Sequence, residues 1–379
     1  MIKIGVVGIG NMGTSHARNL YENKVPGAKL SAICDISKAR RDYAKEAFKF
    51  VKIYDAYEDM LKGDIDAVIV ATPHYDHPAM GISALESNLH VLVEKPIGVY
   101  TKAVKDLNEA SKKSDKIFTI MYNQRTNPLY KKVRELVQSG KIGVLIRVHW
   151  ICTDWFRTQS YYDSGGWRAT WKGEGGGVLL NQCPHQLDLL QWICGMPKSV
   201  RSFMSYGKYH DIEVEDDVTT YMEYENGASG LFVTSTGEAP GVNRLEISGS
   251  LGRLLVENGK IVFYKNEVDM IDHLNTSKEG FKKPDLWVCE IQVEGEETGH
   301  VGIMKDFVNA ISGSDQLSPG EEGIHGLTLS NAMHLSSWTD SQVTLPIDED
   351  LFERLLQERV EKSKMKDVES TFMDVRGSH

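Results

Sequence analysis

The sequence predicts an α/β protein of two domains: a doubly wound parallel sheet, then a second domain of mostly antiparallel sheet. Three observations support this. A turn with the spacing G-x-G-x-x-G follows the first apolar run, apolar runs alternate with helical patterns to about residue 121, and Asn-Gly pairs interrupt later strand-like runs. Strand–helix alternation is typical of a parallel sheet, whereas Asn-Gly between apolar runs predicts a hairpin. Because 379 residues exceed one ordinary core, we expect domains at 1–123 and 124–379.

Composition narrows the class of protein. Hydrophobic residues make up 41% and charged residues 25% of the chain, as in soluble globular proteins. A net charge of −10 argues against nucleic acid or an anionic membrane as a partner. The five cysteines have no C-x-x-C spacing, and we find neither a signal peptide nor a membrane-length apolar run. These features predict free thiols and a cytoplasmic location.

The glycine turn is expected to bind a dinucleotide. Residues 2–7 predict a buried strand and residues 12–22 a helix. Gly8 permits a tight turn, Gly10 lets backbone approach a pyrophosphate, and Gly13 lets the helix lie close to the sheet. N–H groups at the start of the helix then face the phosphates. The predicted cradle consists of Gly8, Ile9, Gly10, Asn11, Met12 and Gly13.

Asp35 is the candidate for ribose binding. It ends the second apolar run, 30–34, about twenty residues after Gly13, where an acidic residue reaches the ribose hydroxyls. A carboxylate there repels a 2′-phosphate, so NAD is favoured over NADP, although the basic residues that follow would weaken that preference. Ile36 is included in this cofactor site. The alternative for Asp35 is a turn residue at the end of a strand.

The alternation continues through the first domain. We expect helices at 37–50, 56–61, 79–88 and 101–113, and strands at 51–54, 65–72, 90–93 and 117–121. Open α/β sheets bind ligands at the carboxyl ends of their strands. The candidates there are Ala71, Thr72, Pro73, His74 and His77, then Glu94 and Lys95, and then Tyr122, Asn123 and Arg125.

The second half predicts hairpins. We expect a helix at 128–139, a strand at 144–150, hairpins pairing 218–224 with 228–235 and 253–256 with 260–264, helices at 181–194 and 302–312, and an exposed, helix-poor loop at 267–283. An antiparallel sheet needs one face covered, which helices and a second subunit's sheet can supply.

Three clusters carry candidate chemistry. Lys95, at a strand end and fixed by Pro96, can hydrogen-bond a reacting hydroxyl and stabilise an alkoxide; the alternative is a solvated surface lysine. Trp167 and Arg168 can stack on a nicotinamide or pair with a diphosphate, or can form a domain-interface pair. The glycine run at 173–177 is either a phosphate cradle or a flexible active-site loop.

The third cluster is Asn181 and His185, whose spacing places both on one face of a helix. Imidazole is suited to take a hydroxyl proton, while Asn181 can orient His185 or hold a substrate hydroxyl. The alternatives are a core histidine and, for Asn181, the helix N-cap, with Pro184 in the first turn. His74, Asp76 and His77 share one loop without a visible third partner, so no metal site is expected.

The sequence resembles the glucose–fructose oxidoreductase / inositol dehydrogenase family, Gfo/Idh/MocA, over almost its whole length. The matching residues are Gly8 to Gly13 with His16, Asp35, 71–73, 94–96, Trp167-Arg168, the G-G-G-x-x-x-N-x-x-x-H run at 175–185, 307–311, 319–320 and 345–346. The resemblance implies an N-terminal Rossmann domain, a C-terminal α/β domain with a large open antiparallel sheet, and homo-oligomers (dimers, tetramers or larger) packed through those sheets. Lys95 and His185 are implied to be catalytic. Asn181 stands where better-studied members carry aspartate, which leaves Lys95 and His185 as the acid–base pair.

We therefore expect an NAD-dependent oxidoreductase that transfers hydride between the nicotinamide and a secondary hydroxyl of a sugar, cyclitol or glycoside. Aromatic faces and polar forks suit a ring rich in hydroxyls. The substrate candidates are Lys95, Tyr122, Arg125, Tyr162, Trp171, Asn181 and His185. Two alternatives are a tightly bound NAD recycled during glycoside oxidation, elimination or cleavage, and a non-catalytic NAD-linked carbohydrate-binding or sensor protein.

Overall fold

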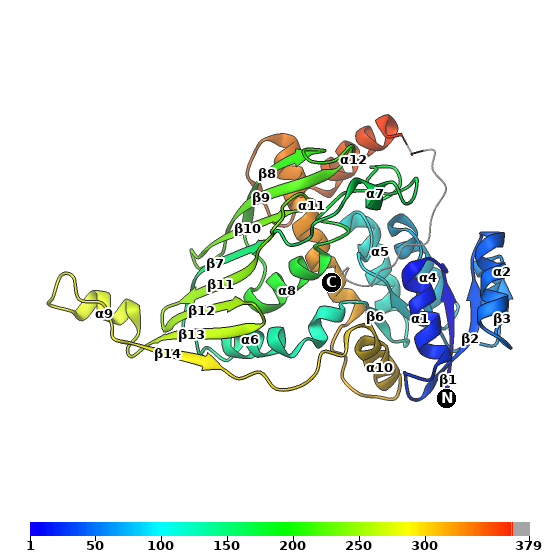
Figure 1. The fold of residues 1–379 in the computed structure, drawn as a ribbon, viewed down its shortest axis with the longest axis horizontal. Coiled ribbons are helices and arrows are strands. Elements are labelled where there is room, and N and C mark those ends of the chain that lie inside the picture. Colours follow the sequence, from blue (N-terminus) through cyan, green and yellow to red (C-terminus); the bar gives the residue numbers. More distant parts are fainter. Residues whose placement is uncertain (365, 367–379) are drawn as a thin grey trace.

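The computed structural model describes residues 1–364 and 366, and in them the chain builds a six-stranded and a nine-stranded sheet (Figure 1). Helices accompany both sheets, so the predicted α/β class is confirmed. In Figure 1 the first sheet lies at the right, with the N-terminus, and the larger sheet extends to the left.

The first sheet is parallel, in the order β3-β2-β1-β4-β5-β6 of a doubly wound fold. Its strands are β1 (Ile2–Val7), β2 (Ala28–Cys34), β3 (Lys52–Tyr54), β4 (Ala67–Val70), β5 (His90–Val93) and β6 (Phe118–Ile120). The helices between them are α1 (Asn11–Tyr21), α2 (Lys38–Ala47), α3 (Tyr57–Leu61), α4 (His77–Glu86) and α5 (Thr101–Lys112). Every residue of β4 is buried, as a continuous apolar run predicts for a strand covered on both faces.

The second sheet has the order β14-β13-β12-β11-β7-β10-β9-β8-β15, and within its described strands β7 with β10 is the one parallel pair. Its strands are β7 (Leu145–Cys152), β8 (Ser199–Tyr206), β9 (Glu215–Glu223), β10 (Ser229–Ser235), β11 (Asn243–Gly249), β12 (Gly252–Glu257), β13 (Lys260–Asn266), β14 (Leu286–Ile291) and β15 (Val343–Thr344). Both predicted hairpins are confirmed. At the second, Asn258 and Gly259 have φ of 51° and 73°, the left-handed conformation that such two-residue turns require.

The large sheet has two different faces. Helix α8 (Pro184–Cys194) contacts both α6 (Pro128–Gln138) and α11 (Gly323–Thr339), and α6 and α11 also contact strands of the sheet. Thr220 and Phe232 are buried on the covered face. On the other face Phe203 and Tyr221 remain 59% and 45% exposed. The remaining helices are α7 (Gln159–Tyr162), α9 (Met270–Thr276) and α12 (Glu349–Lys362).

A late segment returns to the first sheet. Helix α10 (Gly299–Ile311) lies beside α1 (Figure 1), and its Ile303, Met304 and Phe307 belong to the same buried cluster as residues of β1 and β5. Further along, Pro319 pairs with Thr119 at β6. The first sheet is therefore completed by residues from the last quarter of the chain.

Two local predictions were wrong. The segment 267–283 contains α9, because the side chain of Asp269 caps the N–H of Ile271 and starts a helix, although no residue of α9 is buried. The second wrong prediction is the start of the helix expected at 181–194, because α8 begins at Pro184 and not at Asn181. Proline favours the first helical position, and the preceding residues form turns in which Gly177 O accepts from Asn181 N at 2.9 Å. Across residues 1–364 and 366 we find no helix with the length and apolarity needed to span a membrane.

Candidate active site

The glycine turn has the geometry that its spacing predicts. Gly8 has a φ of 85°, and a Cβ there would lie 2.5 Å from Ala71 O. A Cβ on Gly13 would lie 1.8 Å from Gly8 O, so only glycine lets α1 come this close. A Cβ on Gly10 would meet nothing within 4 Å. Gly10 is also the N-cap of α1 without a side-chain cap, so its open surface adjoins free N–H groups of the first turn, which suit a phosphate.

Asp35 lies against this turn. Its carboxylate accepts hydrogen bonds from Ile9 N at 2.7 Å and from Ser37 N at 2.7 Å. The side chain is half-buried, and Ile36 beside it is 92% exposed. Asp35 therefore presents a fixed carboxylate next to the glycine turn, at the carboxyl ends of β1 and β2.

The ends of β4 and β5 are held together by a histidine. Both ring nitrogens of His77 lie within hydrogen-bond distance of main-chain carbonyls, Thr72 O at 2.8 Å and Pro96 O at 2.7 Å. The loop between Thr72 and His77, which carries Pro73 and His74, is therefore tied to the segment that carries Lys95. Asn123, in the short helix after β6, is buried.

Glu94, which follows β5, forms an ion pair with His16 of α1. His16 Nε2 of α1 lies 2.5 Å from Glu94 Oε1, and both side chains are buried. Burial would raise the pKa of Glu94, but the hydrogen bond with His16 and the nearby charges of His16, His300 and Lys95 lower it to about 2. Glu94 is thus a carboxylate at neutral pH.

Lys95 reaches from the first sheet to the second half of the chain. Its Nζ donates to the main-chain oxygen of Asn181 at 2.8 Å. Burial lowers the pKa of Lys95, Glu94 and Glu174 raise it, and Arg168 and Arg157 lower it further. The net shift is downward, which favours proton exchange by this amine.

The loop before α8 surrounds that contact with polar groups. Glu174, which the sequence analysis did not single out, is buried and contacts the Asn181 amide with its Oε1. Tyr161, also missed, donates to Asn181 Oδ1 at 3.1 Å and accepts from Arg168 Nη1 at 3.0 Å. The sequence signal that could have identified Glu174 is its position as the single charged residue within the glycine run 173–177. Trp167 packs edge-on to His74, with ring centres 6.0 Å apart, so it lies where the two halves meet.

The glycine run itself does not cradle a phosphate. Its Gly177 N donates to the buried carboxylate of Glu215 at 2.9 Å, as does Leu179 N at 3.0 Å. Gly173 N donates a hydrogen bond to Thr170 Oγ1 at 3.0 Å. With these N–H groups already bonded inside the protein, the phosphate-cradle alternative is wrong.

His185 lies in the first turn of α8 and is buried. Its ring packs edge-on to Tyr122, with centres 6.1 Å apart. Asn181 precedes α8, so the predicted shared helical face with His185 is wrong. The alternative, Asn181 as the N-cap, is also wrong because Cys183 occupies that position. It is nevertheless placed near the site, through the contact of its carbonyl with Lys95.

Four other predicted substrate residues have their polar atoms engaged elsewhere or are buried. Arg125 is 0% exposed, and its guanidinium pairs with Asp188 and Glu322 at 2.7 and 2.5 Å. Tyr122 OH donates to Gly323 O at 3.2 Å. Trp171 is buried in an aromatic cluster with Trp338. These placements give no support to a direct role in substrate binding.

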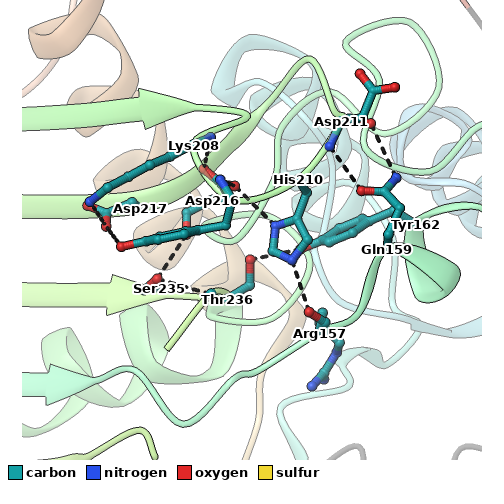
Figure 2. A network of polar contacts seen from close by, with 12 residues as sticks. Arg157, Gln159, Tyr162, Lys208, His210, Asp211, Asp216, Asp217, Ser235 and Thr236 are labelled. Carbon is teal, nitrogen blue, oxygen red and sulfur yellow. Dashed lines mark hydrogen bonds and ion pairs between the residues drawn. The ribbon is translucent and has the colours of Figure 1, made fainter. Parts of the chain in front are cut away.

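Tyr162, the fourth, belongs to a network that fixes the segment 157–162 to the second sheet (Figure 2). Its hydroxyl donates to Thr236 Oγ1 at 2.9 Å. His210 joins Arg157 O, at 2.9 Å, to the buried carboxylate of Asp216, at 3.1 Å. The network therefore holds Arg157 and Tyr161 in place at the edge of the site. Among the described residues no cluster of three or more His, Cys, Asp or Glu side chains could hold a metal ion.

Comparison with known families identifies the architecture. Residues 2–122 match the model of an oxidoreductase family with an NAD-binding Rossmann fold, GFO/IDH/MocA, and residues 130–255 match the GFO/IDH/MocA C-terminal domain. Together the two matches cover more than half of the chain. This protein belongs to the GFO/IDH/MocA family. The first sheet is its NAD-binding Rossmann domain, and the open cradle at Gly10, the first turn of α1 and the carboxylate of Asp35 fit that cofactor.

Individual relatives of this GFO/IDH/MocA protein are oxidoreductases. The myo-inositol 2-dehydrogenase of Thermotoga maritima is 28% identical over 68% of this chain and 75% of its own length. The scyllo-inositol 2-dehydrogenase (NAD(+)) of Bacillus subtilis is 28% identical over 67% of this chain and 73% of its own length. Among solved structures, the WlbA dehydrogenase of Chromobacterium violaceum, in complex with NADH and UDP-GlcNAcA, is 27% identical, with a TM-score of 0.77 over 92% of this chain and 96% of that one.

Proposed function

We propose that this protein is an NAD-dependent dehydrogenase that acts on a secondary hydroxyl of a sugar, cyclitol or glycoside. The observation that carries the proposal is the contact of Lys95 Nζ with Asn181 O at 2.8 Å. It brings the lysine at the end of β5 to the segment that leads into α8 and His185. The inositol dehydrogenase relatives support a polyol or sugar as the substrate class.

The roles follow from the chemistry of the two side chains. Bound NAD supplies the carbon that accepts or donates the hydride. Lys95 donates a hydrogen bond to the reacting oxygen and stabilises its negative charge, which a partly buried cation does more strongly than a fully solvated one. His185 takes the hydroxyl proton, since imidazole exchanges protons near neutral pH. His185 is buried and Lys95 is partly buried, so water has limited access to a hydroxyl held between them.

The cofactor is assigned to the edge formed by the glycine turn and Asp35. Asp35 binds the ribose hydroxyls, which selects NAD over NADP, and the exposed Ile36 offers an apolar surface to the adenine. The remaining cofactor contacts come from the ends of β4, β5 and β6 and from Trp167 and Arg168. We assign the protein to the cytoplasm because its five cysteines are free thiols.

The test is turnover of a panel of sugars, inositols and glycosides, followed by NADH formation. His185→Ala should lower kcat by about 10²–10⁴-fold, the usual value of general acid–base catalysis, without changing NADH binding. His273→Ala, on the exposed helix α9, is the matched control and should keep full activity. Equal turnover by His185→Ala and the parent would refute the assignment of the base. NADH absorbance in the purified protein before cofactor is added would instead favour a recycled NAD.

A further inference from the structure

Glu174 is a buried carboxylate whose two oxygens are both engaged. It is 2% exposed, its Oε2 accepts from Ala169 N at 2.6 Å, and its Oε1 contacts Asn181 Nδ2. Burial raises the pKa of Glu174 above its usual value, although the charge of Arg168, the Ala169 N–H, the Asn181 amide and the charge of Lys95 oppose this rise. A buried carboxylate is costly unless it is paired and hydrogen-bonded. Glu174 is hydrogen-bonded through both oxygens, and the positive charges of Arg168 and Lys95 lie nearby.

The contacts of Asn181 allow one orientation of its amide. A carboxylate can only accept, so the NH₂ group must face Glu174. The opposite oxygen then accepts from Tyr161 OH at 3.1 Å and from Gln182 Nε2, which can only donate, at 3.2 Å. The main-chain oxygen of the same residue accepts from Lys95 Nζ. Glu174 therefore fixes the residue on which the Lys95 ammonium rests.

The charges around Lys95 show why this carboxylate matters. Glu94 and Glu174 favour the ammonium form, and Arg168 and Arg157 oppose it. Glu94 is already paired with His16 at 2.5 Å. Glu174 thus supplies the negative charge from the second half of the chain, where the substrate hydroxyl is to be bound.

We propose that Glu174 is a positioning residue, which holds the Asn181 amide in one orientation and keeps Lys95 protonated. The effect on turnover rests on the proposed function, whereas the effect on the protonation of Lys95 is independent of it. Glu174 acts through these two residues and needs no contact with the substrate.

The first experiment measures Lys95 directly. In the full-length protein, the rate at which acetic anhydride labels Lys95 is followed by mass spectrometry against pH, because only the free amine reacts. Glu174→Gln removes a nearby negative charge and should lower the pKa of Lys95 by about one unit, so that labelling near neutral pH is about tenfold faster. Glu246→Gln, on β11 and paired with Arg244 and Arg253, is the matched control and should label like the parent. An unchanged Lys95 rate in folded Glu174→Gln would overturn the proposal.

The second experiment exchanges the two partners. Asn181→Asp alone places two carboxylates in contact, and Glu174→Gln alone removes the charge, so each should lower kcat about tenfold with the KM for NAD unchanged. The double variant Glu174→Gln/Asn181→Asp restores both the hydrogen bonds and the charge. The amide introduced at position 174 donates to the carboxylate introduced at position 181, and its oxygen still accepts from Ala169 N. The kcat of the double variant should return to within about threefold of the parent, a pairwise coupling of the kind double-mutant cycles measure.

Two outcomes separate the two hypotheses. A double variant no better than either single variant, with thermal unfolding unchanged, would contradict the positioning role. Absence of turnover by the parent on every sugar would contradict the proposed function and leave the labelling experiment as the test of Glu174.

Discussion

Gly10 and Gly13 lie three residues apart, yet a methyl group would meet different surroundings at each. Gly13→Ala places a Cβ 1.8 Å from Gly8 O and forces α1 away from the sheet. We expect a loss of about 2 kcal/mol in the free energy of unfolding, as for other overpacked sites. Gly10→Ala meets no protein atom within 4 Å, so stability should be unchanged, while NADH binding falls about tenfold or more because the methyl group occupies the phosphate cradle.

Chemical denaturation and NADH fluorescence titration separate these two effects. If Gly10→Ala bound NADH like the parent, the phosphate would not lie on this turn.

Asp35 provides the second prediction at this scale. Asp35→Asn keeps a hydrogen-bond acceptor for Ile9 N or Ser37 N, so the fold should persist. The loss of negative charge removes the repulsion of a 2′-phosphate, and the ratio of kcat/KM for NAD to that for NADP should fall about tenfold, a change of about 1.4 kcal/mol. Steady-state kinetics with both cofactors measure this ratio. Asp42→Asn, on the exposed side of α2, is the control and should leave it unchanged.

At the scale of elements, the pair of His16 and Glu94 joins α1 to the end of β5. The pKa of Glu94 is lowered from 4.5 to about 2 in the folded protein. A lowered carboxyl pKa stabilises the fold above the unfolded value, and this contribution is lost as the pH falls from about 4.5 towards 2. The shift corresponds to about 3 kcal/mol, because one pKa unit is worth about 1.4 kcal/mol.

Urea unfolding at pH 6, 4.5 and 3 measures this loss. Glu94→Gln should flatten the decline over that range, whereas Glu109→Gln, on the exposed face of α5, should decline like the parent. A parallel decline in Glu94→Gln would show that other carboxylates dominate.

The elements that the sequence predicts well are those with a strong local pattern. The strands of the first sheet are apolar runs between clear breaks, and Asn258-Gly259 has the dihedral angles its sequence favours. Helix α11 has no such pattern, because buried residues lie on all its sides and no amphipathic stripe forms. It was therefore not predicted.

The candidate site was predicted in the same uneven way. Glycine spacing identifies Gly8, Gly10 and Gly13 because each serves a local backbone requirement. The partners of Asn181 could not be predicted, since Glu174 and Lys95 reach it only through tertiary packing. Arg125 is of a residue type that often binds substrate. Its ion pairs with Asp188 and Glu322 could not be predicted, because those partners lie 63 and 197 residues away in the sequence.

At the scale of the whole molecule, the uncovered face of the large sheet predicts self-association. Phe203 and Tyr221 are exposed on β8 and β9. They lie on the same face of the sheet because Phe203 pairs with Thr219, which is two residues from Tyr221 on β9. We expect a homo-oligomer packed through this face, burying about 1,200–2,000 Å² or more. Phe203→Lys/Tyr221→Lys should convert it to a monomer that still binds NADH.

Size-exclusion chromatography with light scattering measures the mass. Phe281→Lys, which changes a fully exposed phenylalanine outside the sheet, is the control and should keep the parent's mass. A monomeric parent would contradict the interface.

The division into domains at residue 123 stays a prediction.

The return of α10 to the first sheet has a consequence for biosynthesis. Ile303, Met304 and Phe307 are wholly buried in the same cluster as Ile4 and Leu92. While a ribosome is still translating the strands of the large sheet, the nucleotide-binding half lacks these side chains and exposes the apolar surface that they later cover. We therefore expect the nucleotide-binding half to complete its core only after α10 has emerged from the ribosome, late in the synthesis of the chain.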